Sequence, residues 1–167
     1  AQAVRALTGL GADLMTLHGS GGSAMLKAAA VAAADEARRL SVIRPKLLAV
    51  TVLTSIDADE WKKLGHTNSI SQSVLTMAGA AKAAGMDGTV SSPHEAAEIR
   101  RLNGPDFLIV TPGIRPSFAQ SDDQKRVTTP KEAVQNGATH LVVGRPITKA
   151  ADPQEAARAI AEEIREV

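Results

Sequence analysis

Apolar residues gather in five short runs along the chain, and longer amphipathic segments separate these runs. The runs lie near residues 14–17, 47–53, 86–90, 107–111 and 140–143. Apolar runs of this length are typical of strands that are buried on both faces of a parallel sheet. The repeated alternation of such strands with helical segments predicts an α/β fold, with a curved parallel sheet in sequence order and helices along its outer face.

The segments between the apolar runs carry helix signals. Helical patterns cover residues 2–10, 23–40, 57–64, 69–84, 92–102, 129–137 and 152–165. Three of these segments open in the same way, with a capping residue, proline at the first helical position and glutamate at the third, starting at Ser92, Thr129 and Asp152. This is the pattern of a capping box, and it predicts where each of the three helices begins.

The stretch from Phe107 to Pro146 is the most informative part of the chain. Arg115 and Arg145 each follow an apolar run that ends at a glycine, so we expect both at the carboxyl ends of parallel strands, where α/β folds place ligand sites. With glycine N–H groups and the amide of Gln124, the two guanidinium groups predict a cradle for a phosphate dianion. The Gly/Ser turn at residues 18–22 either offers N–H groups to a ligand or is a plain turn.

The composition of the chain argues against several classes of function. The chain has 167 residues, which is a one-domain length, and a net charge of +1, which predicts no broad basic surface for nucleic acid. Aromatic residues make up 2% and cysteine is absent, which argues against base-stacking platforms, disulfides and thiolate metal sites. No apolar run approaches the ~20 residues of a membrane span and no secretory signal is visible, so the expected location is the cytoplasm.

Four motifs, in this order, resemble the orotidine-5'-monophosphate decarboxylase family: VTVLTS (50–55), VTPGIRP (110–116), DDQKR (122–126) and VVGRPIT (142–148). The resemblance runs from about residue 2 to the end of the chain. It implies a TIM (β/α)8-barrel enzyme of pyrimidine biosynthesis, a carboxy-lyase that converts orotidine monophosphate to UMP and CO2. It also implies that no metal or organic cofactor takes part, and that the complete protein is a homodimer with its sites at the subunit interface.

The resemblance assigns roles to the residues of these motifs. Thr54 corresponds to a hydroxyl residue beside the pyrimidine ring, and the residues that correspond to the loops holding the phosphate and closing over the base are Arg115, Gln124, Gly144 and Arg145. Simpler alternatives stay open from the residues themselves. The two arginines fit surface ion pairs, Gln124 fits an ordinary loop amide, and Thr54 fits a helix cap. Ligand contacts of His18 and Ser55 are left undecided.

The chain departs from the family where the chemistry takes place. The resemblance implies a lysine on one early strand and an Asp-x-Lys-x-x-Asp motif on the next, and neither has a counterpart here. Asp123-Gln124-Lys125 reads Asp-x-Lys, but it lies in the expected phosphate-side loop and lacks the final aspartate. We therefore expect no catalytic residue in this chain, and we treat Asp123-Gln124-Lys125 as a coincidental match.

Strand count and length predict a single domain over residues 1–167, with about five of the eight βα units of the barrel and without the first three strands. The expected function is that of the decarboxylase, with this chain carrying the part that binds the phosphate and the base. Two alternatives are a non-catalytic phosphate-binding half-barrel and a related sugar-phosphate decarboxylase or aldolase. The expected ligand is a small molecule, orotidine monophosphate or UMP.

Overall fold

The structure, a computed structural model, describes residues 1–116 and 127–165. Its sheet has five parallel strands in sequence order: β1 (Leu14–His18), β2 (Lys46–Val50), β3 (Gly88–Val90), β4 (Leu108–Thr111) and β5 (His140–Leu141). The parallel order that the sequence predicts is therefore confirmed. Because every connection between neighbouring strands is a crossover, each strand end at the carboxyl edge leads into a helix on the outer side.

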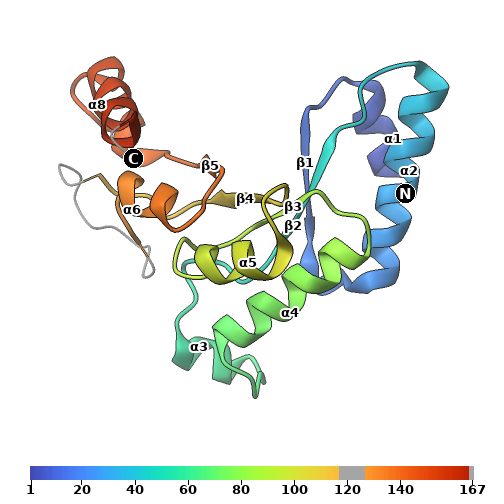
Figure 1. The fold of residues 1–167 in the computed structure, drawn as a ribbon, viewed down its shortest axis with the longest axis horizontal. Coiled ribbons are helices and arrows are strands. Elements are labelled where there is room, and N and C mark those ends of the chain that lie inside the picture. Colours follow the sequence, from blue (N-terminus) through green and yellow to red (C-terminus); the bar gives the residue numbers. More distant parts are fainter. Residues whose placement is uncertain (117–126, 166–167) are drawn as a thin grey trace.

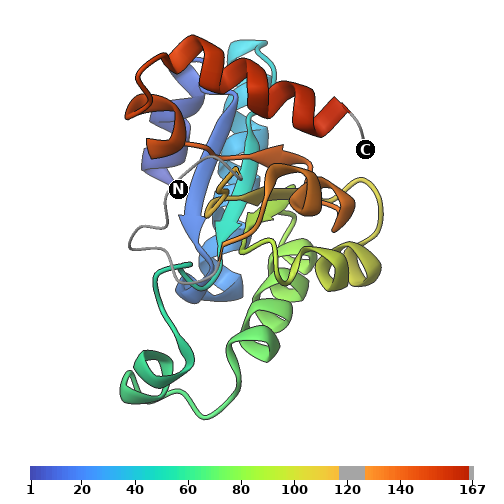
Figure 2. The same ribbon diagram turned by 90° about the vertical axis from the view of Figure 1, so that its left-hand side faces the viewer.

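Eight α-helices are described, and they are α1 (Gln2–Gly9), α2 (Gly22–Leu40), α3 (Ala58–Lys63), α4 (Ile70–Ala83), α5 (Ala96–Asn103), α6 (Pro130–Gln135), α7 (Arg145–Thr148) and α8 (Pro153–Arg165). A short 3-10 helix, η1 (Gly19–Gly21), precedes α2. The sheet bends between β1 and β5, and α1, α2, α4 and α5 lie along its outer side (Figure 1). In the rotated view, α3 projects away from the sheet (Figure 2).

Two apolar clusters fill the space between the sheet and these helices. The first packs the outward residues of β1 and β2 against α2, whose alanines let the helix approach the sheet closely. Its fully buried members include Leu26, Ala33 and Leu47. The second packs β4 against α4 and α5, with Val74, Ile99 and Ile109 fully buried. Burial of apolar surface on the outer face therefore helps to hold these helices to the sheet.

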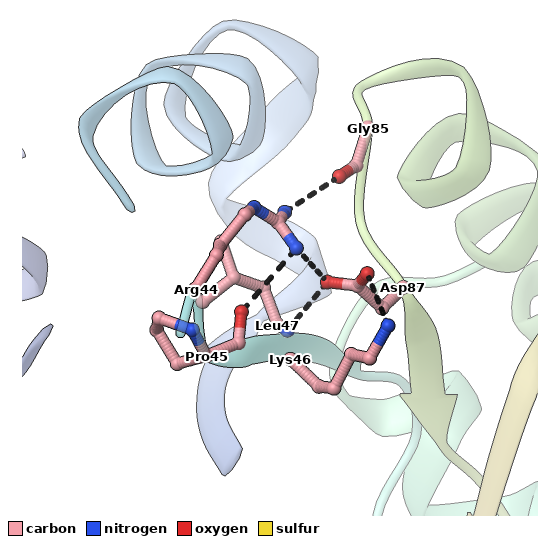
Figure 3. A network of polar contacts seen from close by, with 6 residues as sticks. All are labelled: Arg44, Pro45, Lys46, Leu47, Gly85 and Asp87. Carbon is pink, nitrogen blue, oxygen red and sulfur yellow. Dashed lines mark hydrogen bonds and ion pairs between the residues drawn. The ribbon is translucent and has the colours of Figure 1, made fainter. Parts of the chain in front are cut away.

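The amino-terminal edge of the sheet is closed by a polar network around Asp87, which directly precedes β3 (Figure 3). Its Oδ2 accepts hydrogen bonds from Arg44 Nη1 at 2.7 Å and from the backbone N–H of Leu47 at 2.8 Å. The Lys46 ammonium lies 3.7 Å from the other carboxylate oxygen. These contacts join β2 to β3 at the edge opposite the strand ends that carry the predicted ligand residues.

The observed elements differ from the predicted ones at three places near the site. The helix start predicted at Ser92 is wrong, because residues 93–95 form a turn and α5 begins at Ala96 without a side-chain cap. The second strand is predicted to reach residue 53 but ends at Val50, because Thr51 makes the last ladder bond, to Val90 O at 3.0 Å, before the chain turns. The single-turn helix α7 is not predicted, because four residues are too few to show a helical period. The carbonyl of Gly144 accepts from Ile147 N and Thr148 N at 2.9 and 3.0 Å and starts this turn.

Candidate functional site

A cavity of about 220 Å³ lies at the carboxyl ends of β2, β3 and β4. Its lining is mostly apolar, with hydroxyl groups from three residues, and consists of Val50, Val52, Leu53, Thr54, Ser55, Val90, Ser91 and Pro112. Thr54 is 5% exposed, so its hydroxyl is set into the wall of the cavity, whereas Ser55 is exposed. An apolar recess with a few hydroxyl groups suits a planar ring that carries polar substituents.

Hydrogen bonds between neighbouring strand ends shape this cavity. The Thr51 hydroxyl donates to Val90 O at 3.0 Å and lies 3.1 Å from the Ser91 hydroxyl. The Ser91 N–H in turn donates to Val110 O at 3.0 Å. The turns that follow β2 and β3 are thereby fixed to the next strand, and both Thr54 and Ser91 line the recess. Neither Thr51 nor Ser91 is predicted as a site residue, because the only signal for either in the sequence is a hydroxyl residue directly after an apolar run.

The strand register places both predicted arginines at this same edge. Thr111 of β4 pairs with Leu141 of β5, and Arg115 and Arg145 each lie four residues beyond their strand's member of that pair. Thr54 similarly lies four residues beyond Val50, the last residue of β2. The predicted placement of the three residues on one rim is confirmed. Their contact with a ligand stays a prediction.

Arg115 is held by its backbone and leaves part of its guanidinium group unused. Its N–H donates to Thr128 O at 2.9 Å, and Nη1 donates to Ile114 O at 2.9 Å. Nη2 is buried and has no hydrogen-bond partner among the described residues. A buried charged donor without a partner is costly, and an anionic ligand would supply the missing acceptor.

The other predicted site residues differ in exposure and in their place in the fold. Gly144 is exposed and caps α7, and Arg145 is the first residue of that helix and partly buried. Gln124 lies outside the described residues. His18, the exposed last residue of β1, pairs with Val50, which lines the cavity, so it also lies at this edge. Whether His18 contacts a ligand stays open, as does the role of the Gly/Ser turn that follows it.

Within residues 1–116 and 127–165, no group of three or more His, Cys, Asp or Glu side chains is arranged to hold a metal ion. None of the described helices is both long and apolar enough to cross a membrane.

Comparison with known proteins decides the family. A model of the orotidine 5'-phosphate decarboxylase / HUMPS family matches residues 1–160. The chain belongs to this family. The resemblance that the four motifs carry is therefore confirmed, and so is the assignment of the fold to the TIM-barrel family, with five βα units in this chain.

Relatives within the orotidine 5'-phosphate decarboxylase / HUMPS family are similar over almost the whole chain. Proteins named orotidine 5'-phosphate decarboxylase from Moorella thermoacetica and Trichlorobacter lovleyi are 50% and 52% identical, each over 98% of this chain. The crystal structure of orotidine 5'-phosphate decarboxylase from Lactobacillus acidophilus is 40% identical with a TM-score of 0.81, over 97% of this chain and 67% of that one. The chain spans 66% and 67% of the length of the two curated relatives, or about two thirds.

Proposed function

We propose that this chain carries the phosphate- and base-binding part of an orotidine-5'-phosphate decarboxylase, the carboxy-lyase that converts orotidine monophosphate to UMP and CO2 in pyrimidine biosynthesis. In this proposal the phosphate is bound by Arg115, Gln124, Gly144 and Arg145, and Thr54 lies beside the pyrimidine ring. We further propose that the complete protein acts in the cytoplasm as a homodimer, without a cofactor.

One observation carries the proposal: Arg115 and Arg145 lie at matched positions beyond paired strands, on the edge that also holds the cavity behind Thr54. The Nη2 of Arg115, which is buried and has no hydrogen-bond partner in the described part of the chain, supports an anionic ligand at this edge. An apolar recess and two guanidinium groups at the same edge fit a nucleotide, with the ring in the recess and the phosphate at the arginines. The phosphate is remote from the reacting carbon of the ring. Its binding would supply energy that favours the transition state at the ring.

The test compares UMP with uridine, which differ only by the phosphate. Arg145→Ala and Arg115→Ala should each weaken UMP binding by about 10- to 100-fold, as expected for the loss of a charge-assisted hydrogen bond, and leave uridine binding nearly unchanged. The measurement is isothermal titration of each ligand into wild type and variants. Arg38→Ala is the control, because Arg38 pairs with Asp35 on the exposed side of α2.

Equal losses for UMP and uridine would show that the arginines do not bind the phosphate. A wild-type chain that binds both ligands with the same affinity would overturn the proposed phosphate site altogether.

A second function, binding without catalysis, is favoured by where the lysines lie. The described ones belong to helices or helix caps, or begin β2 at the opposite edge, and they are Lys27, Lys46, Lys62, Lys63, Lys82, Lys131 and Lys149. None of them adjoins the cavity. For this chain taken alone, we therefore propose nucleotide binding rather than turnover.

A further inference from the structure

Thr128, two residues before α6, fixes the backbone that carries Arg115. The Thr128 N–H donates to Gly113 O at 3.3 Å, and its carbonyl accepts the N–H of Arg115 at 2.9 Å. This pair of bonds forms a parallel bridge with Ile114, whose side chain is fully buried. Since both neighbours of Ile114 are bonded to Thr128, a shift of Thr128 would move the backbone of Arg115 with it.

The carboxylate of Glu132 determines where Thr128 lies. A single oxygen, Oε2, accepts from the Thr128 hydroxyl at 2.6 Å, from the Thr129 N–H at 3.1 Å and from the Thr129 hydroxyl at 2.9 Å. The Thr129 hydroxyl also accepts from Glu132 N at 3.3 Å, which completes the capping box of α6. The hydrogen bond from Thr128, followed by those from Thr129, lowers the pKa of Glu132, so the carboxylate stays ionised and a strong acceptor.

The same stretch of chain has a second attachment, to the end of β3. His94 Nε2 lies 3.2 Å from Val127 O and donates to it when that nitrogen carries the proton. His94 lies four residues beyond the end of β3, after the buried serines 91 and 92 and Pro93, so this contact ties Val127 to the neighbouring strand end. Residues 127 and 128 are thus held from two places, the turn after β3 through His94 and helix α6 through Glu132.

We propose that Glu132, acting through the Thr128 hydroxyl, is a positioning residue that sets Arg115 for phosphate binding; this inference rests on the proposed function. Capping the helix would not require the bond to Thr128, because Thr129 alone completes the capping box. The additional bond joins the Glu132 carboxylate to Thr128, whose backbone is bonded to both neighbours of Ile114. It therefore connects the start of α6 to the ligand edge. The capping of α6 therefore does not account for the hydrogen bond between Thr128 and Glu132.

Three variants separate positioning from capping. Thr128→Val removes the hydroxyl but keeps the capping box, and it should reduce the preference for UMP over uridine by about three- to tenfold, as expected for one hydrogen bond. Thr128→Ser retains a hydroxyl and should restore the preference. Thr129→Val removes the cap, so it should lower the melting temperature and leave the preference within about twofold of wild type.

The readout is the ratio of the dissociation constants for uridine and UMP, measured by titration at neutral pH, with the circular dichroism melting curve of each variant as a check on folding. A ratio that is unchanged in Thr128→Val, or that falls equally in Thr129→Val, would overturn the positioning role. The two proposals fail differently: loss of the ratio in Arg115→Ala but not in Thr128→Val would overturn only the positioning role. A wild-type ratio near one would overturn the proposed function, and the positioning role with it.

Discussion

At the scale of single residues, Thr89 carries a polar group that the fold does not use. The residue lies in the middle of β3 with no exposed surface, between Ala49 and Ile109 in the register, and its side chain faces the helices. Its hydroxyl has no hydrogen-bond partner among the described residues. A buried hydroxyl that has lost its water and found no acceptor destabilises the folded state.

Replacing this hydroxyl with a methyl group should stabilise the protein. We expect Thr89→Val, which keeps the shape of the side chain and its β-branching, to raise the free energy of unfolding by about 1 kcal/mol. Thr111→Val is the matched control, because the equally buried Thr111 hydroxyl donates to His140 O at 3.3 Å. Urea unfolding of both variants gives the comparison; a Thr89→Val protein less stable than wild type would show that the hydroxyl finds a partner in solution.

The predicted site residues also show the limit of a single-residue view. Arg115 and Arg145 could be placed from the sequence because a short apolar run followed by Gly and Arg indicates a strand end. The contributions of Thr51 and Ser91 could not, because both act through bonds to a neighbouring strand, 39 to 40 residues away. Register sets these contacts, and nothing in the local sequence reports register between parallel strands.

At the scale of elements, the helix starts at Thr129 and Asp152 formed as predicted, the start at Ser92 did not, and the ties between elements were not predictable. The capping box at Thr129 forms as predicted, with Pro130 as the first residue of α6, because its signals lie within four residues. The strand order also followed from alternation alone. The network at Asp87 joins residues about 40 positions apart and has no local signature (Figure 3).

Arg100 makes a further set of contacts between elements that the sequence does not predict. From the last turns of α5, its Nη1 donates to the carbonyls of Gly104, Pro105 and Phe107 at 2.7, 2.7 and 2.8 Å, and its Nη2 donates to Gly137 O at 3.0 Å. One guanidinium group therefore holds the end of α5, the approach to β4 and the end of α6 together. A planar fork of donors can serve four carbonyl groups in this way, whereas an ammonium group cannot.

We expect Arg100→Met to lower the free energy of unfolding by about 3 kcal/mol, because several partly buried carbonyl groups lose a charged donor. The adjacent Arg101→Met should cost less than about 0.5 kcal/mol, since Arg101 is exposed and its pairing among the described residues is with Glu98 one turn earlier. Chemical unfolding of the two variants side by side is the measurement. Similar losses in both would indicate that the fold does not depend on the Arg100 contacts.

At the scale of the whole molecule, two stabilising networks and the proposed ligand site lie at opposite edges of the sheet. The networks at Asp87 and Arg100 lie toward the edge where strands begin, whereas the cavity, Arg115 and Arg145 lie where strands end. This division is the one that barrels of parallel strands commonly show. It allows the strand-end loops to differ between family members while the opposite edge holds the βα units in place.

The arrangement of charges at the ligand edge predicts that the 167-residue chain alone will not decarboxylate orotidine monophosphate. The reaction leaves a carbanion on the ring, which needs a cation as charge partner and proton donor, and such electrostatic stabilisation is usually the largest catalytic term. The described residues place two guanidinium groups at this edge, and none of the described lysines lines the cavity. Arginine is too weak an acid to protonate a carbanion readily, so binding without turnover is the expected behaviour.

The measurement is the fall in absorbance of orotidine monophosphate with purified protein whose mass has been verified. Wild type should bind UMP yet show no turnover above the buffer rate. Adding a separately purified segment from a family relative, one that carries the Asp-x-Lys-x-x-Asp motif, should produce activity if the two pieces assemble. Lys125, outside the described residues, is the one lysine that the sequence places near the phosphate. Turnover by the chain alone that survives repurification and disappears in Lys125→Ala would show that the Asp123-Gln124-Lys125 match is functional after all.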